Sequence, residues 1–222
     1  MDHAVKIISA VKILHNVIQF TIEKPEGFKF KPGQATDLTI NQDGWKDKKN
    51  PFTFTGLNED PHLQFTIKIY EDSGEGVTKH LGELKPGDEL MISDPWGAIA
   101  YKGTGYFIAG GAGITPFIAI LRELNKKGEV KGNELFFSNK TKNDIILQNE
   151  LKMILGVDVI FTTTEDKEAE GEHRRINEKF LKDEVEDFSR QFYVCGPDKM
   201  VHEISKTLEE LGARVDSVVF EK

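Results

Sequence analysis

The strongest constraint on the fold is a regular alternation of strand-like and helix-like segments that begins after Gly103-Thr104-Gly105. Short apolar segments occur at 106–111, 134–138, 157–164, 191–195 and 214–220. Segments with helical periodicity separate them, at 115–128, 144–154, 176–185 and 197–212. Strands that alternate with helices in this way are typical of a parallel α/β sheet. In the first helix we expect Thr115 as the cap, Pro116 in the first turn and Gly128 at the end.

The first hundred residues follow a different pattern, that of antiparallel β structure. Segments rich in β-branched and aromatic residues lie at 5–14, 17–25, 34–40, 52–57, 63–70 and 88–95. Turn formers such as PEG, KPGQ, NEDP and LKPGD separate them. Six short strands at this spacing indicate an antiparallel barrel or a sandwich. We therefore expect two domains, residues 1–102 and residues 103–222.

Composition and charge argue against several classes of function. The net charge of −8 disfavours nucleic acid as the main partner, because phosphate binding needs a basic surface. No apolar stretch approaches the ~20 residues of a membrane helix, and the start of the chain lacks the features of a signal peptide. The single cysteine, Cys195, excludes an intrachain disulfide, so a cytoplasmic location is expected. The six histidines have no ligand spacing, so no metal site is expected.

A glycine-rich loop, GGAGITP, lies between the first strand of the α/β half and its helix. Glycines let backbone amides approach a phosphate closely, and the following helix N-terminus adds a favourable partial charge. The loop is therefore a candidate dinucleotide site through Gly111, Gly113, Ile114, Thr115 and Pro116. It departs from the standard Gly-x-Gly-x-x-Gly fingerprint, because Pro116 stands at the place of the third glycine. A tight strand-to-helix turn without a ligand would use the same residues.

The second strand of the α/β half ends in Ser138-Asn139-Lys140-Thr141. Sites that prefer NAD often place an acidic residue at this position for the ribose 2′-hydroxyl. Ser138 and Lys140 offer a hydroxyl and a cation instead, which suits a 2′-phosphate and favours NADPH over NADH. Asp144 lies nearby and weakens this interpretation, and an ordinary polar loop remains the alternative.

Cys195-Gly196-Pro197 repeats the strand–turn–helix design of the glycine loop, with Pro197 opening the helix. In a doubly wound sheet ligands bind at the carboxyl edge of the strands. Cys195 is therefore expected near the same crevice as the glycine loop. A buried structural cysteine is the alternative.

Several of these segments, taken in order, resemble one family. They are FKPGQ (30–34), NPFT (50–53), GEGVTKHL (74–81), LKPGDEL (84–90), DPWG (94–97), GGAGITP (110–116) and CGP (195–197). The chain is similar to the ferredoxin–NADP reductase superfamily, and most of all to its compact bacterial ferredoxin/flavodoxin reductase-like members. The resemblance implies a six-stranded flavin-binding barrel followed by a pyridine-nucleotide domain. It also implies hydride transfer from NAD(P)H to a flavin, which then passes electrons on singly.

The same resemblance implies roles for individual residues of the barrel domain. Phe52 would stack on the isoalloxazine ring, and Thr53 would offer its hydroxyl near N5. Backbone groups would meet the polar edge of the ring or the ribityl chain at Ile67, Lys68, Ile69 and Tyr70. The flavin phosphate would lie at Gly76, Val77 and Thr78.

In the second domain the resemblance places the nucleotide pyrophosphate at Gly111, Gly113 and Thr115. Cys195 would lie near the nicotinamide carbon, in the loop that continues with Gly196 and Pro197. Phe220 would cover the flavin face that the nicotinamide must reach and would have to move aside. A core position in the last strand is the alternative for Phe220.

The clearest departure from the family pattern is Asn50. The family places an arginine there, before the aromatic and the hydroxyl residue, as a partner of the flavin pyrophosphate. Asn50 and Pro51 open the corresponding segment here, and an amide offers hydrogen bonds but no charge. Lys48 or Lys49 could supply charge from a shifted position. FAD is favoured as the flavin, and FMN remains open.

Three functions are consistent with these residues. The first is a stand-alone NAD(P)H-dependent flavoprotein reductase that serves a ferredoxin or flavodoxin, or a small acceptor. The second is a flavin-bearing electron-relay subunit of a larger complex. The third is a flavin-free binding module, which Asn50 alone favours. Ferredoxins and flavodoxins are commonly acidic and so is this chain, so docking would depend on a local basic patch.

Overall fold

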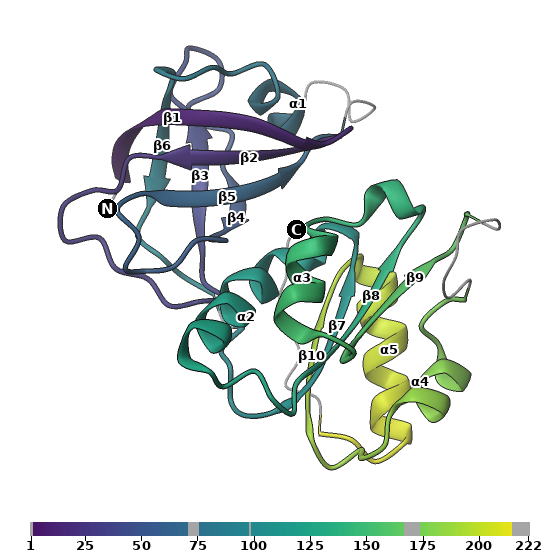
Figure 1. The fold of residues 1–222 in the computed structure, drawn as a ribbon. Helices are drawn as coiled ribbons and strands as arrows, with labels where there is room; N and C mark the ends of the chain where they lie inside the picture. Colours follow the sequence, from purple (N-terminus) through teal and green to yellow (C-terminus); the bar gives the residue numbers. More distant parts are fainter. Residues whose placement is uncertain (1, 71–75, 98, 167–173, 215–222) are drawn as a thin grey trace.

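The computed structural model describes residues 2–70, 76–97, 99–166 and 174–214. Two bodies lie side by side: a β domain formed by the first part of the chain and an α/β domain formed by the rest (Figure 1). Among the described residues, none of the helices combines the length and the apolar character needed to cross a membrane.

The β domain is one six-stranded antiparallel sheet that curls into a nearly closed barrel. Its strands are β1 (Asp2–Leu14), β2 (Val17–Ile22), β3 (Ala35–Ile40), β4 (Asn50–Thr53), β5 (Leu63–Lys68) and β6 (Glu89–Ser93). They are ordered β4-β3-β6-β1-β2-β5, and a bridge between Phe54 and Phe65 joins the two edges. The six predicted strands are confirmed, and the structure decides for the barrel over the sandwich.

An aromatic cluster fills the barrel. Phe30 stacks on Phe54 with 4.3 Å between ring centroids, and Phe54 contacts Phe65 at 5.1 Å. Phe54 and Phe65 are fully buried. Burial of such rings gives most of the stabilisation in a small barrel core.

A short helix, α1 (Val77–Leu81), closes one end of the barrel. The sequence predicted a phosphate-binding turn there and no helix. Val77 and Leu81 are buried on one face of α1 and belong to the barrel core, because residues four apart share a helix face. Tertiary burial therefore stabilises a helix that is too short to form alone.

The second domain contains a four-stranded parallel sheet ordered β10-β7-β8-β9. Its strands are β7 (Gly105–Gly110), β8 (Glu134–Asn139), β9 (Val159–Thr163) and β10 (Gln191–Cys195). The helices are α2 (Thr115–Lys127), α3 (Gln148–Leu155), α4 (Glu178–Glu184) and α5 (Asp198–Glu210), with 3-10 turns η1 (Gly111–Ile114) and η2 (Lys142–Asp144). The predicted parallel α/β sheet is confirmed. The fifth predicted strand, 214–220, lies almost entirely outside the described residues.

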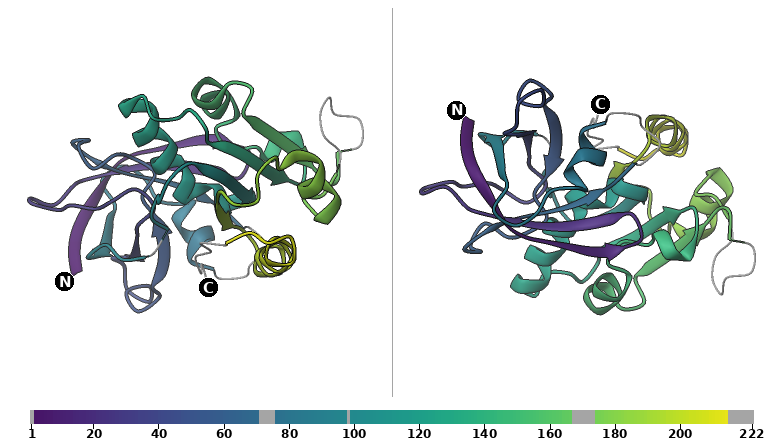
Figure 2. Two further views of the ribbon diagram at one scale, coloured as in Figure 1. Left: turned by 90° about the horizontal axis from the view of Figure 1, so that it is seen from below. Right: turned by 90° about the horizontal axis from the view of Figure 1, so that it is seen from above.

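Helices cover both faces of this sheet (Figure 1, Figure 2). Phe107 and Ala109 of β7 pack with α2 and α3, whereas Tyr106 and Ile108 pack with α4 and α5. Successive side chains of a strand point to opposite faces, so a strand covered on both sides reads as a continuous apolar run. That is the pattern of the segment 106–111.

Two details of the helices differ from the prediction. Thr115 is the first residue of α2, and its hydroxyl donates to the carbonyl of Ala112 (3.0 Å), so it does not cap the helix. The helix expected from residue 144 begins at Gln148, because Asp144 instead caps η2 together with Thr141. The predicted end of α2 at Gly128 is confirmed, with φ at +71°.

Candidate functional site

Three cavities meet where the end of β5 faces the carboxyl edge of the parallel sheet. The first, the barrel cavity, has a volume of about 310 Å³. It is lined by Asn50, Pro51, Phe52, Thr53, Thr66, Ile67, Lys68, Tyr70, Gly76, Val77, Thr78, Ala112 and Thr115. Strands β4 and β5 and helix α1 therefore bring nearly all the predicted flavin-binding residues to one cavity, and the glycine loop closes it.

The second, the sheet-edge cavity, has a volume of about 550 Å³. Its walls come from the ends of all four parallel strands and from two barrel residues, Lys68 and Tyr70. The glycine loop contributes Gly111 and Gly113, β8 contributes Ser138, Asn139 and Lys140, and β10 contributes Cys195, Gly196 and Pro197. The parallel topology gathers these segments, since the carboxyl ends of parallel strands lie at one edge.

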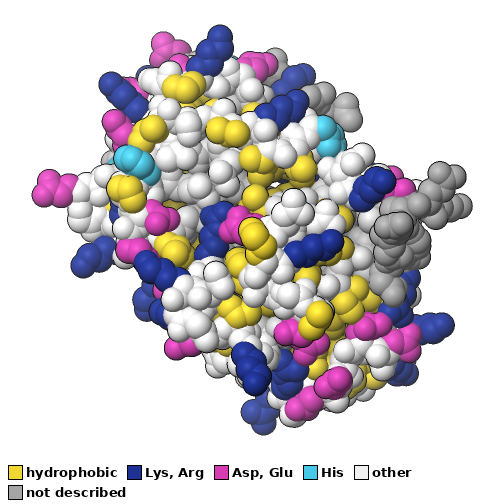
Figure 3. Space-filling view, in the orientation of Figure 1, with side chains coloured by type: hydrophobic (Ala, Val, Ile, Leu, Met, Phe, Trp, Pro, Cys, Tyr) yellow, Lys and Arg dark blue, Asp and Glu magenta, His cyan; other side chains and the backbone are white. Residues whose placement is uncertain are grey.

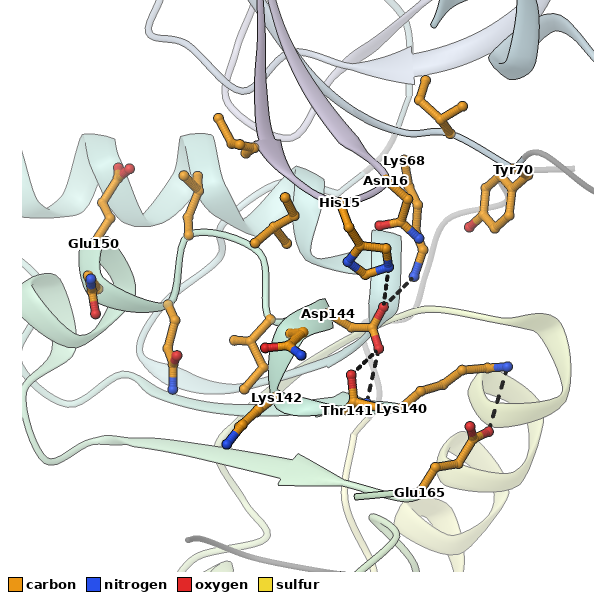
Figure 4. A pocket seen from close by; sticks show the side chains of 18 residues that line it. His15, Asn16, Lys68, Tyr70, Lys140, Thr141, Lys142, Asp144, Glu150 and Glu165 are labelled. Atoms are coloured by element: carbon orange, nitrogen blue, oxygen red, sulfur yellow. Dashed lines mark hydrogen bonds and ion pairs between the residues drawn. The ribbon is translucent and has the colours of Figure 1, made fainter. Parts of the chain in front are cut away.

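The third, the interdomain cleft, is the largest, at about 1350 Å³. Residues 13–16 and 68–70 of the barrel form one wall, and residues 140–145, 147–150 and 165 of the α/β domain form the other (Figure 4).

Acidic and basic side chains are interspersed on the face of the molecule that Figure 3 shows. This face therefore carries no broad single-sign field that would attract a partner from a distance.

Lys68 and Tyr70 line all three cavities, so the three cavities adjoin at these two residues. Tyr70 has about half of its surface exposed (49%). A ligand in the barrel cavity and a ligand in the sheet-edge cavity would therefore contact the same two side chains.

An ion cluster around Asp144 joins the two domains at this point (Figure 4). The Asp144 carboxylate lies 3.6 Å from Lys68 Nζ and 3.7 Å from His15 Nε2, both of the barrel. It also accepts hydrogen bonds from the backbone N–H (3.0 Å) and the hydroxyl (2.7 Å) of Thr141. Burial alone would raise the pKa of Asp144, but the hydrogen bonds from Thr141 and the nearby charges lower it.

Two glycines of the loop have different roles. A Cβ on Gly113 would lie 2.4 Å from the carbonyl oxygen of Cys195, so this residue must be glycine for the two loops to pack together. Gly111 has φ at +53°, and a Cβ there would meet no atom within 4 Å. The open side of the loop, where a ligand could approach the backbone, is therefore at Gly111.

Other predicted residues lie elsewhere. Ile114 and Pro116 are buried in the α/β domain and line none of the three cavities. Ile69 lines the interdomain cleft. Cys195 is 3% exposed, at the base of the sheet-edge cavity. Phe220 lies outside the described residues.

The cation expected for a 2′-phosphate has an acidic neighbour. Lys140 Nζ lies 3.6 Å from Glu165, and both side chains are mostly exposed. An exposed pair of this kind is weak, so a phosphate could compete for the lysine.

Several lining residues are not predicted as ligand contacts from the sequence. Asn139 is 5% exposed, and neither its amide nitrogen nor its amide oxygen has a hydrogen-bond partner among the described residues. A buried amide without partners is destabilising, so Asn139 is a candidate for ligand contact. His15 is not predicted because it lies outside the recognised motifs, and Thr66 is not predicted because the contacts expected on its strand begin at Ile67.

Comparison with known proteins agrees with this architecture. Residues 4–101 match the family model of the oxidoreductase FAD-binding domain, and residues 107–206 match that of the oxidoreductase NAD-binding domain. The fold and the paired cavities thus define a two-domain FAD- and NAD-binding protein. The chain belongs to the ferredoxin reductase-like superfamily.

Three individual proteins illustrate the similarity. NADH-cytochrome b5 reductase 2 of Mycosarcoma maydis is 30% identical, over 86% of this chain and 60% of that protein. The reductase component of propane 2-monooxygenase from Rhodococcus jostii is 26% identical, over 90% of this chain and 57% of that protein. The chain thus spans about 60% of the length of these relatives. A ferredoxin NADP+ reductase of Neisseria gonorrhoeae, solved with bound FAD and NADP, shares the fold with a TM-score of 0.84 at 19% identity, covering 97% of this chain and 94% of that one.

Proposed function

We propose that this protein is an NAD(P)H-dependent flavoprotein reductase that passes hydride from a nicotinamide nucleotide to FAD and then electrons to an acceptor. The main observation in support is that the barrel cavity and the sheet-edge cavity adjoin at Lys68 and Tyr70. Hydride transfer needs two rings in contact, and binding in adjacent cavities would supply that proximity.

The residues of the barrel cavity fit a flavin. Phe52 is partly buried against the barrel core and would offer a flat apolar surface to the ring. Thr53, 8% exposed, would place a hydroxyl at the ring edge. Gly76, Val77 and Thr78 would hold the phosphate, since no described side chain caps the start of α1 and its first N–H groups remain for a ligand. Asn50 and Pro51 would border the same phosphate.

The residues of the sheet-edge cavity fit a nicotinamide nucleotide. The open backbone at Gly111, with the N-terminus of α2 behind it, would hold the pyrophosphate. Ser138, Asn139 and Lys140 would contact the adenosine ribose. Cys195 and Gly196 would border the nicotinamide.

Bound FAD would supply a two-electron acceptor that can release electrons singly. The protein itself would position the flavin and the nicotinamide and shield them from water. Tyr70 would restrict water at the junction of the cavities, and Phe52 would shield the ring inside the barrel cavity. The Thr53 hydroxyl would donate a hydrogen bond to a ring nitrogen. Phe220 as a mobile cover of the ring remains a prediction.

Two finer points of the proposal concern the nucleotide and the acceptor. NADPH is favoured over NADH by Ser138 and Lys140, whereas Glu165 beside Lys140 opposes a 2′-phosphate. The acceptor is a ferredoxin- or flavodoxin-type protein or a small molecule, and the relatives' names suggest a cytochrome or an oxygenase as further classes. A relay subunit within a larger complex would use the same site, and it is the second candidate because one relative is a reductase component.

Absorption spectroscopy of the purified protein tests the function. We expect a yellow protein that releases FAD on denaturation and is bleached by NADPH, faster than by NADH, in the absence of oxygen. Lys140→Ala should reduce the preference for NADPH, and Lys182→Ala, an exposed helix residue outside the cavities, is the control. A protein that stays colourless after incubation with FAD and FMN would refute the proposal.

A further inference from the structure

A fourth cavity lies beside α1 and belongs to none of the sites described above. It has a volume of about 320 Å³ and is lined by Gly44, Trp45, Lys48, Gly76, Lys79, His80 and Glu83. We call it the tryptophan cavity. Gly76 also lines the barrel cavity, so the two cavities adjoin at the start of α1.

An aromatic pair forms one wall of the tryptophan cavity. The rings of Trp45 and His80 stack with 4.3 Å between centroids and 9° between planes. His80 is itself fixed, since Nε2 lies 3.0 Å from Gln42 Oε1 and Nδ1 lies 3.0 Å from Glu83 Oε2. The backbone N–H of Trp45 donates to the carbonyl of Gln42 (3.0 Å). The indole is thus oriented before any ligand binds, which lowers the cost of binding.

Lys48 also contacts the indole. Its Nζ lies 4.0 Å from the ring centroid of Trp45. His80 and Lys48 are thus the two groups in contact with the indole. Lys48 has an exposed, flexible side chain, whereas His80 is held at both ring nitrogens. The Lys48 side is therefore the face that a ligand can take.

The chemistry of the cavity is that of a nucleotide site. It combines one available aromatic face with two lysines, Lys48 and Lys79. A purine base stacks on an indole, and lysines bind phosphate. The adjoining barrel cavity has Asn50 where the family has an arginine, so it lacks that positive charge for a pyrophosphate.

We infer that the tryptophan cavity holds the adenylate half of the flavin dinucleotide, an inference that rests on the proposed flavin site. The adenine stacks on Trp45 in place of Lys48, and the ammonium groups of Lys48 and Lys79 turn to the pyrophosphate. These lysines supply the charge that Asn50 lacks. The cavity thereby selects FAD over FMN, which has no adenylate half.

Flavin binding to the apoprotein, measured by quenching of flavin fluorescence, tests this inference. Trp45→Ala should weaken FAD binding by about 10- to 100-fold and leave FMN binding unchanged. Trp45→Phe should restore most of the affinity, since it keeps an aromatic face. Trp96→Ala is the matched control, because Trp96 is the second tryptophan, is 40% exposed and lies outside this cavity.

A second measurement does not depend on the folding of the alanine variant. In Trp96→Phe apoprotein Trp45 is the sole tryptophan, and ADP should quench its emission, with a weaker response after Lys48→Met. Equal losses of FAD and FMN affinity in Trp45→Ala, or unchanged FAD affinity, would overturn the adenylate site while leaving the flavoprotein intact. Wild-type protein that binds neither flavin would instead overturn the proposed function, and this inference with it.

Discussion

Loss of Arg122 of α2 should weaken the contact between the two domains. Its Nε and Nη2 donate to the two carboxylate oxygens of Glu150 at 2.5 and 2.8 Å. Its Nη1 donates to the carbonyl of Thr55 and to Gln64 Oε1 of the barrel, both at 2.6 Å. The side chains of Arg122 and Glu150 are 19% and 30% exposed, so the pair is only partly screened by solvent.

The change Arg122→Met keeps the apolar stem and removes the guanidinium. It leaves Glu150 as a half-buried carboxylate and leaves the Thr55 carbonyl without this donor. Loss of one partner costs about 3–5 kcal/mol for a buried pair and about 0–1 kcal/mol for an exposed one. The partial exposure places the expected loss at about 2–4 kcal/mol of unfolding free energy, or about 4–16 °C in melting temperature for a chain of this size.

Thermal and urea unfolding followed by circular dichroism measure this loss. Adding Glu150→Gln to Arg122→Met should recover part of it, because the unpaired charge is removed. The control is Lys182→Met, which breaks an exposed pair with Glu178 at 2.6 Å and should cost below about 0.5 kcal/mol. If Arg122→Met is no more destabilised than this control, the partly buried network does not stabilise the domain contact.

Three further predictions concern the candidate site. Gly113→Ala should destabilise the protein by about 1–3 kcal/mol in urea unfolding, because its Cβ would lie 2.4 Å from the Cys195 carbonyl; wild-type stability would contradict the packing role. The pKa of Asp144 is lowered in the folded protein, so the ionised carboxylate stabilises the fold at any pH above its unfolded-state pKa near 3.8. This stabilisation disappears as the pH falls through the pKa of the folded state. Asp144→Asn should therefore lower the unfolding free energy at pH 7 and converge with the wild type in acid, and a pH-independent difference would argue against this role. Thr53→Val should slow anaerobic flavin bleaching roughly 10- to 100-fold while FAD stays bound, and an unchanged rate would remove the hydroxyl from the mechanism.

Much of the fold is readable from the sequence because its signals are local. The alternation in segments such as 63–70 predicts β5, and the apolar run at 106–111 predicts a strand buried on both faces. Gly128 predicts the end of α2, where a left-handed conformation is needed. The departures are α1, the late start of α3 and the position of Thr115. Helix α1 depends on burial against the barrel core, whereas the other two depend on local hydrogen bonds, between Thr141 and Asp144 and between Thr115 and Ala112, that helical periodicity does not reveal.

The candidate site is readable only in part. The sequence motifs predicted nearly all the residues that line the barrel cavity. They also predicted Ser138, Lys140 and Cys195 in the sheet-edge cavity. Asp144 was interpreted only as an acidic residue that opposes NADPH. Its carboxylate instead lies between Lys68, His15 and Thr141, and no local pattern links it to Lys68 and His15 of the barrel.

By itself, the sequence determined the two domain types, the strand order along the chain, and the glycine and CGP loops, since periodicity and turn chemistry act over a few residues. The tertiary structure alone decided that the sheet closes as a barrel and that the end of β5 faces the carboxyl edge of the parallel sheet. It also decided that the loop carrying Trp45 lies against α1 beside Gly76. These results come from long-range packing, which brings together residues whose own segments give no sign of one another.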